Sequence, residues 1–363
     1  MLTRRCLTIA ALAFCCNAAN AQQPFYAGKQ LTILVNYDAG GPTDIEARLL
    51  SRYLGRHIAG NPRINLKNMA GAAGMVATKY LGEVASRDGT MLGYFTGATQ
   101  RYVSIPERFN VDFLTYDFIA AMPSTRIHVM RTDVWPGMKS AADVVRGENI
   151  VVGGLGPRQP KDMAMRLTLD MLGARYSYVT SYNSSAEGFS ALLRGEINFY
   201  ADSQPLYQMK IAPEIKAGKL IPVYYDPGFD GKDFSVPAAV KDRAILPFHE
   251  FYRSIKGTMP SGELWEAYKS QLLINGTMYR MLTLPPGSPR EAADALRAAI
   301  VKVAADKAYI AAANKLMGDV PEYLTGPTLK DDVRAAVSNN RATKAFMDAY
   351  ANRNKDAYSK QAK

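Results

Sequence analysis

Glycine-rich turns stand where short apolar runs pass into helical patterns, and turns of this kind can bind anions. The first is Gly40-Gly41-Pro42-Thr43, which follows the apolar run 31–35 and precedes a helical pattern over 43–58. Free N–H groups and the helix dipole favour negative charge at a helix start. Thr43 and Glu46 have the spacing of a capping box. We therefore expect an anion such as a carboxylate here, although the glycines could equally serve only to permit a tight turn.

Three further segments have a similar composition. Residues 68–75, 153–158 and 182–185 each join a β-rich run to a helical pattern, and the last two lie in the second half of the chain. The small residues of 68–75 are explained better by close helix packing, and this segment lacks the dinucleotide-binding fingerprint. Several such turns divided between two halves favour anion capture more strongly than any one of them does.

Motifs of the common enzyme classes are missing from the sequence. It contains no GxSxG elbow, HExxH helix, Walker loop or SxxK motif. His57, His128 and His249 lie far apart, so each is better explained as a surface or core residue than as a catalytic base or metal ligand. We therefore expect no catalytic residues, no metal site and no cofactor.

The first 21 residues have the pattern of a signal peptide. Arg4 and Arg5 precede a short apolar run over 7–14, and Ala19-Asn20-Ala21 is a small-x-small cleavage site that would leave Gln22 as the first mature residue. The alternative is a buried N-terminal helix. All three cysteines, Cys6, Cys15 and Cys16, lie in this segment, so the mature chain would have no disulfide or thiolate site. The sequence thus predicts a periplasmic protein.

The charge balance also favours an anionic partner. The formal net charge is +11, and removal of Arg4 and Arg5 leaves +9. The basic residues are scattered rather than clustered, which argues against nucleic acid. A small anionic solute fits this composition better.

Short β-rich runs alternate with helical runs along the chain, which predicts an α/β fold. Expected strands include 31–35, 91–95, 127–130, 150–152, 197–201 and 220–225, and a long amphipathic helix is expected over 289–304. Residues 227–261, rich in Pro, Gly and Asp, are expected to form an irregular surface excursion. The chain is long enough for two domains with separate cores.

Several motifs together resemble the Bug family of extracytoplasmic receptors, the substrate-binding components of tripartite tricarboxylate transporters. The motifs are Gly40-Gly41-Pro42-Thr43-Asp44 before a helix, Asn68 with Gly71-Ala72-Ala73-Gly74, Asp88-Gly89-Thr90, the segment 182–202 with its Leu-Leu-x-Gly-Glu run at 192–196, and Pro285-Pro286-Gly287-Ser288-Pro289. The resemblance runs from about Lys29 to the C-terminal helices.

The resemblance implies a type II-like periplasmic clamshell, in which each domain is a mostly parallel sheet flanked by helices and a small carboxylate binds between the two. The expected domains are 22–125 with 279–363, and 126–278. The expected ligand-binding residues of the first domain are Tyr37, Asp38, Ala39, Gly40, Gly41, Pro42, Thr43, Gly97, Ala98 and Thr99. Those of the second are Gly156, Pro157, Arg158, Tyr182, Asn183 and Asp202.

Some positions depart from the family pattern. Met69-Ala70 replaces Arg-Pro, Asn183 replaces Lys, and Asp38 adds a negative charge just before the glycines. Asp38 could meet an amine or hydroxyl of the ligand, or could simply face solvent. We expect a monomer that captures a small organic acid for delivery to membrane transporter subunits. The alternatives are a ligand-sensing subunit for a membrane receptor and, with less support, an exported α/β hydrolase.

Overall fold

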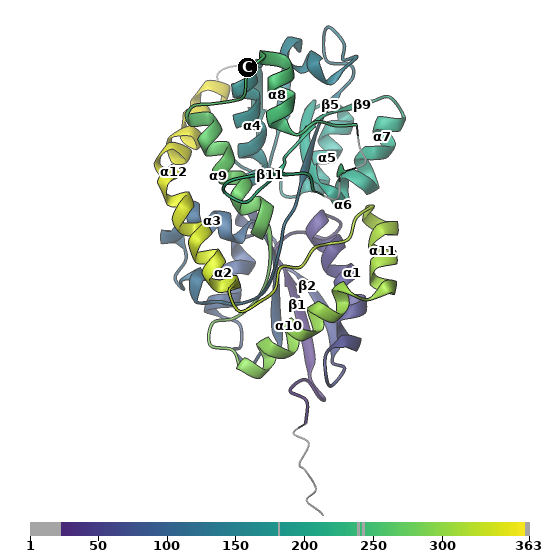
Figure 1. Cartoon of the computed structure of the whole chain (residues 1–363), viewed down its shortest axis with the longest axis vertical. Helices are drawn as coiled ribbons and strands as arrows, with labels where there is room; N and C mark the ends of the chain where they lie inside the picture. The colour runs from purple at the N-terminus through teal and green to yellow at the C-terminus, as the bar shows by residue number, and fades with distance from the viewer. Residues whose placement is uncertain (1–22, 181, 238–239, 242–243, 360–363) are drawn as a thin grey trace, which may run out of the picture.

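The computed structural model describes residues 23–180, 182–237, 240–241 and 244–359 (Figure 1). The expected signal peptide and its three cysteines lie outside these residues. Within them, no helix combines the length and the apolar character needed to cross a membrane.

Two five-stranded sheets form the centre of the molecule. The first has the order β2-β1-β3-β12-β4, and the second has the order β7-β6-β8-β5-β9. In the first sheet β12 runs antiparallel to both of its neighbours, while β1 is parallel to β2 and β3. In the second sheet β5 is the reversed strand and β6 is parallel to β7 and β8. The prediction of an α/β fold with mostly parallel sheets is confirmed.

The strands are bounded as follows. The first sheet contains β1 (Gln30–Val35), β2 (Arg63–Asn68), β3 (Met91–Thr96), β4 (Asp117–Met122) and β12 (Arg280–Leu284), and the second contains β5 (Arg126–Arg131), β6 (Ile150–Gly153), β7 (Tyr176–Val179), β8 (Phe199–Ser203) and β9 (Leu220–Tyr225). The two sheets therefore have equivalent topologies. In each, the reversed strand is the first one formed after the chain crosses from the other half, β5 in the second sheet and β12 in the first. The chain crosses at 123–125, between β4 and β5, and again between helix α9 and β12.

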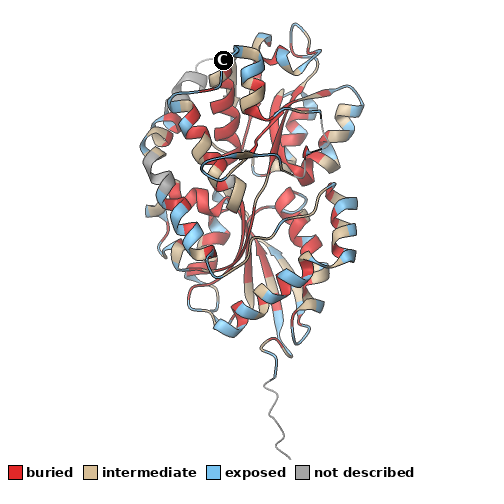
Figure 2. Cartoon of the chain, in the orientation of Figure 1, coloured by how far each residue is buried: buried red, intermediate tan, exposed pale blue. Residues whose placement is uncertain are grey.

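Helices cover both faces of both sheets (Figure 1). In chain order they are α1 (Pro42–His57), α2 (Met75–Glu83), α3 (Ala98–Ser104), α4 (Pro160–Leu172), α5 (Ser185–Arg194), α6 (Gln204–Leu206), α7 (Ala212–Lys216), α8 (Phe248–Lys256), α9 (Glu263–Met278), α10 (Arg290–Ala304), α11 (Lys307–Met317) and α12 (Leu329–Ser359). Along α1, α10 and α11, buried residues alternate with exposed ones (Figure 2), and the buried apolar residues pack on one face of the first sheet. Leu50, Leu296 and Ala313 among them are inaccessible to solvent. Burial of these apolar side chains is the main stabilising contribution to such a core.

The long helices α9 and α12 pack against each other and extend over both sheets (Figure 1). Near its start α12 contributes Val333 and Val337 to a cluster with residues of the first sheet, and further along it contributes Met347 and Tyr350 to the core of the second. The domain bounds expected from the sequence remain a prediction, and α12 connects the two halves rather than belonging to one sheet.

The segment 227–261 differs from its expectation. It contains the hairpin of β10 (Gly228–Phe229) and β11 (Phe234–Ser235) and the helix α8. Phe248 and Phe251 of α8 are buried in the core of the second sheet, beside Trp265. The expectation of an irregular excursion was wrong here because the aromatic residues spaced along 248–252 outweigh the turn-forming composition around them.

Candidate ligand-binding site

A cleft between the two sheets contains an inner and an outer cavity. The inner cavity is lined by Tyr37, Asp38, Gly41, Pro42, Thr43, Thr96, Gly97, Leu155, Gln159, Pro160, Lys161, Ser184, Ser185, Asp202, Ser203, Tyr279 and Arg280. The outer cavity shares Tyr37, Asp38 and Leu155 with it and adds Ala70, Gly71, Ala72, Ala73, Gly74, Tyr182 and Asn183. The volumes are about 30 Å³ for the inner cavity and about 480 Å³ for the outer one. A solute larger than a few waters therefore reaches the inner residues only when the two halves separate.

The glycine turn between β1 and α1 forms the first wall of the inner cavity. Gly40 has a φ of +84° and Gly41 has a φ of −85°, so only Gly40 needs a residue without a Cβ for conformational reasons. Gly41 lies at the cavity, and Gly40 donates its N–H to Asp44 Oδ2 at 2.9 Å. That N–H is thus already used within the protein, and the N–H groups of the first helical turn are the ones available to an anion.

The expected capping box at this turn is wrong. Gly41 is the N-cap and Pro42 begins α1, so Thr43 lies two positions too far along the helix to cap it. Thr43 Oγ1 instead hydrogen-bonds Thr96 Oγ1 at 2.8 Å. Glu46 accepts a hydrogen bond from Tyr94 and forms an ion pair with Arg280, so its carboxylate faces away from the helix start. Burial raises the pKa of Glu46, although Arg280 opposes this effect.

The turn between β6 and α4 forms the second wall and has the same construction. Pro160 begins α4, and Asp162 accepts the N–H of Gly156 at 2.7 Å, as Asp44 accepts that of Gly40. A Cβ on Gly154 would lie 1.9 Å from Asp162 Oδ2, so only glycine fits there. Burial raises the pKa of Asp162, whereas hydrogen bonds, led by that from Arg48, hold the pKa of Asp44 below its usual value in spite of burial.

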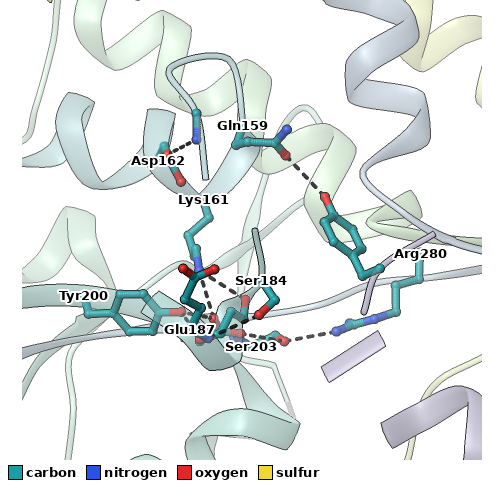
Figure 3. A network of polar contacts seen from close by, with 12 residues as sticks. Gln159, Lys161, Asp162, Ser184, Glu187, Tyr200, Ser203 and Arg280 are labelled. Carbon is teal, nitrogen blue, oxygen red and sulfur yellow. Dashed lines mark hydrogen bonds and ion pairs between the residues drawn. The ribbon is translucent and has the colours of Figure 1, made fainter. Parts of the chain in front are cut away.

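Lys161 places a buried ammonium group in the inner cavity (Figure 3). Its Nζ donates to Asp202 Oδ2 at 3.0 Å, to Tyr200 Oη at 2.8 Å and to Ser185 Oγ at 3.2 Å. Burial raises the pKa of Asp202, but the Lys161 charge and the surrounding hydrogen bonds outweigh it and lower that pKa. A cation and its counter-ion are therefore held together at the cavity surface.

The helix α5 also begins at this surface. Ser184 is its N-cap and accepts the N–H of Glu187 at 3.2 Å, while Glu187 accepts the N–H of Asn183 at 2.7 Å. This reciprocal pair fixes the helix start and presents Ser184 and Ser185 to the cavity. The inner cavity thus receives the N-termini of helices from both halves, which favours negative charge inside it.

The two walls also contact each other directly. Gln159 Oε1, from the second wall, accepts hydrogen bonds from Arg101 at 2.9 Å and from Tyr37 at 3.4 Å, both from the first half. On the far side of the cavity, Arg280 donates to Ser203 Oγ at 3.0 Å. Polar contacts therefore join the two halves on both sides of the inner cavity.

The expected site residues fall into two groups. The two cavities bring together Tyr37, Asp38, Gly41, Pro42, Thr43, Gly97, Tyr182, Asn183 and Asp202. Neither cavity is lined by Ala39, Gly40, Ala98, Thr99, Gly156, Pro157 or Arg158. Arg158 instead forms an ion pair with Asp348 of α12, beside Asn352. The binding roles of all sixteen residues remain predictions.

Sequence reasoning missed several residues that line the inner cavity. Gln159, Pro160 and Lys161 follow the glycine segment by only a few positions, and the Pro-x-Asp pattern shared by 42–44 and 160–162 could have revealed them. Tyr279 and Arg280 carry no local motif, because β12 reaches the cleft only through its place in the first sheet. Among the described residues, no cluster of histidine, cysteine, aspartate and glutamate could hold a metal ion.

Comparisons with known proteins identify the fold. No family model matches the sequence. The chain is 26% identical over 188 residues to the UPF0065 protein in the TAR-I ttuE-ttuC' intergenic region of Agrobacterium vitis, and 24% identical over 210 residues to the UPF0065 protein in the tcbD-tcbE intergenic region of Pseudomonas sp. strain P51. These alignments cover 50% and 55% of the chain, and the chain spans only 52% and 60% of the relatives' lengths.

Solved structures align over most of the chain. The periplasmic binding protein BugD superposes with a TM-score of 0.65 and 18% identity over 90% of this chain and 99% of its own. MatC from Rhodopseudomonas palustris with bound malate gives a TM-score of 0.62, 18% identity and coverage of 89% and 99%. The R. palustris protein Rpa4515 with adipate superposes with a TM-score of 0.63 and 16% identity, over 89% of this chain and 97% of its own. The chain has the fold of a Bug-type periplasmic binding protein. The resemblance inferred from the motifs is confirmed at the level of fold.

Proposed function

We propose that this protein is an extracytoplasmic solute-binding protein that captures a small carboxylate between its two halves. The observation that carries the proposal is the inner cavity, where the start of α1 faces the buried ammonium group of Lys161. A carboxylate there would accept hydrogen bonds from N–H groups of the first helical turn and from the Thr43 hydroxyl on one side. On the other side it would be attracted by the positive charge of Lys161. A hydrogen bond to a charged group contributes about 1.5–3 kcal/mol.

Binding without chemical conversion fits the same geometry. The hydroxyl of Ser185 lies 3.2 Å from Lys161 Nζ, a pairing that could suggest a serine nucleophile with a lysine base. Lys161 is ion-paired with Asp202, and a protonated lysine cannot accept the serine proton. This arrangement supports a binding site and gives no support to the exported hydrolase.

Delivery to a tripartite transporter in the periplasm is part of the proposal, and a sensing role remains the alternative. The support is the shared fold, the cleft that must open to admit a solute, and the signal-peptide pattern of the first 21 residues. We propose that the mature protein works as a monomer, with hinge motion at 123–125 and at the start of β12.

The test is a binding screen on the mature chain beginning at Gln22. Thermal shift followed by calorimetry would compare malate, adipate, citrate, benzoate and glutamate with adipamide, an uncharged analogue of adipate. We expect at least one carboxylate to bind with a micromolar Kd or tighter, about 8 kcal/mol, and adipamide not to bind. Equal responses to adipate and adipamide, or no response to any acid, would contradict carboxylate capture.

A further inference from the structure

A buried guanidinium group lies just behind the surface of the cleft. Arg101 of α3 is only 3% exposed and lines neither the inner nor the outer cavity. A Cβ on Gly97, which lines the inner cavity, would lie 3.3 Å from Arg101 Nη2. A Cβ on Gly74, which lines the outer cavity, would lie 3.0 Å from the same atom. The guanidinium group therefore lies directly behind the backbone that lines each cavity.

Arg101 differs from the two cations that line the inner cavity because it has no counter-ion. Lys161 is paired with Asp202, and Arg280 is paired with Glu46. Within the part of the chain that the structure describes, no carboxylate lies at ion-pair distance from Arg101. Its two Nη atoms donate to uncharged oxygens, and its Nε is buried without a hydrogen-bond partner. Burial of an unpaired charge is costly, so an anionic group brought to Arg101 should be bound strongly.

Gln159 covers Arg101 on the side of the inner cavity. Its Oε1 accepts from Arg101 Nη1 at 2.9 Å, and the residue itself lines the cavity. Tyr37 Oη is a more distant acceptor for the same nitrogen, at 3.4 Å. Gln159 belongs to the other half of the molecule, so opening of the cleft would withdraw its amide oxygen from Arg101. An oxygen of the solute can then take that position before the cleft closes.

We propose that Arg101 binds a second anionic group of the solute, and that the Gln159 amide oxygen occupies the position of that group in the closed cleft. This inference rests on the proposed function, because the first carboxylate is the one bound between the start of α1 and Lys161. A diacid would place its second group on Arg101 after Gln159 rotates aside, whereas a monoacid would leave Gln159 in place. Asp38 lines both cavities but is exposed, so water and salt screen its repulsion of a dianion.

Pairs of acids that differ by one charge test the proposal on the mature chain. Calorimetry at constant ionic strength would compare succinate with butyrate and adipate with hexanoate. We expect the diacid of at least one pair to bind at least about tenfold more tightly, as for a hydrogen bond between charged groups. Equal affinities within both pairs would overturn the role of Arg101 and leave carboxylate capture intact. No binding of any acid would contradict the proposed function, and this inference with it.

Substitution of Arg101 shows whether this residue causes the preference. Arg101→Gln should remove the diacid preference, whereas loss of a purely structural contact would weaken both acids of a pair and leave their ratio unchanged. Circular dichroism and thermal unfolding show whether the variant folds. Arg290→Gln removes the same charge at a side chain that is 90% exposed on α10, and should keep the preference.

Substitution of Gln159 gives a second measurement that leaves Arg101 in place. Gln159→Glu puts a tethered carboxylate next to Arg101, so it should also remove the diacid preference. Gln159→Ala removes the competing oxygen without adding a charge and should keep the preference. A diacid preference that survives in folded Arg101→Gln, or in Gln159→Glu, overturns the proposal.

Discussion

The turns β1–α1 and β6–α4 have one backbone design and different chemistry. In each, a strand ends in a glycine turn, a proline begins the helix, and an aspartate two residues later accepts an N–H group of the turn. The residue between proline and aspartate lines the cavity in both, and it is Thr43 in one and Lys161 in the other. The protein therefore closes each turn with its own carboxylate, and the residue between the proline and the aspartate determines which group faces the ligand.

The difference assigns distinct roles to the two walls. The first wall offers N–H groups and a neutral hydroxyl, which suit any carboxylate irrespective of the rest of the solute. The second wall places a cation beside Asp202, Tyr200 and Ser185, whose geometry is fixed by several hydrogen bonds. We therefore expect the first wall to provide general affinity and the second to select among carboxylates.

The largest expected effect comes from removing the charge of the second wall. Lys161→Met should weaken binding of the best acid from the screen about 100-fold, since a buried charged partner is lost. It should also destabilise the fold by about 3–5 kcal/mol, because Asp202, only 3% exposed at its side chain, would lose its counter-ion. Calorimetry and urea unfolding measure the two effects.

The double variant Lys161→Met/Asp202→Asn separates these effects. It removes both members of the Lys161–Asp202 ion pair, so most of the lost stability should return while binding stays weak. If the double variant binds the acid as tightly as the parent, Lys161 has only a structural role and the proposed contrast between the walls fails.

Smaller effects are expected at the adjacent glycines of the first wall. A substitution at Gly41 should weaken binding and leave stability unchanged, whereas one at Gly40 should lower stability and leave binding unchanged. Gly41→Thr should weaken acid binding about tenfold, because its side chain enters the cavity and its hydroxyl would cap the N–H groups that the ligand needs. Stability should change little, since φ is −85° and threonine is a good N-cap. Gly40→Ala should cost about 1–2 kcal/mol of stability at φ +84° and leave binding intact.

Both variants need calorimetry and thermal unfolding, so that each serves as the control of the other. Tight acid binding by Gly41→Thr would show that the first wall does not hold the carboxylate. Weakened binding by Gly40→Ala, with the fold intact, would mean that the turn acts through its conformation instead.

The sequence predicted the first wall better than the second for a physical reason. Gly40-Gly41-Pro42-Thr43 is local, so turn and helix chemistry within a few residues indicate the site. Lys161 can be recognised as a site residue only from its ion pair with Asp202, which lies 41 positions away in the sequence and is brought next to it by the second sheet. Arg280 likewise reaches Glu46 only because β12 inserts between β3 and β4. Arg158, next to the glycines, was expected at the ligand, and no local pattern revealed its partner Asp348 on α12.

The smallest expected effect concerns the contact that joins the two walls. Gln159 Oε1 accepts from Arg101 and Tyr37 across the cleft, and no carboxylate lies within ion-pair distance of Arg101 among the residues that the structure describes. Gln159→Ala should therefore favour the open cleft by the loss of two modest hydrogen bonds, whereas Gln159→Glu should favour the closed one by forming an ion pair with Arg101.

Small-angle scattering without added acid should give a larger radius of gyration for the alanine variant than for the parent. The glutamate variant should match the parent or be more compact. Acid affinity should fall less than about tenfold in the alanine variant, because closure around the ligand retains the contacts of both walls. An alanine variant as compact as the parent would show that Gln159 does not hold the walls together, and Arg280 with Ser203 would then be the contact to test.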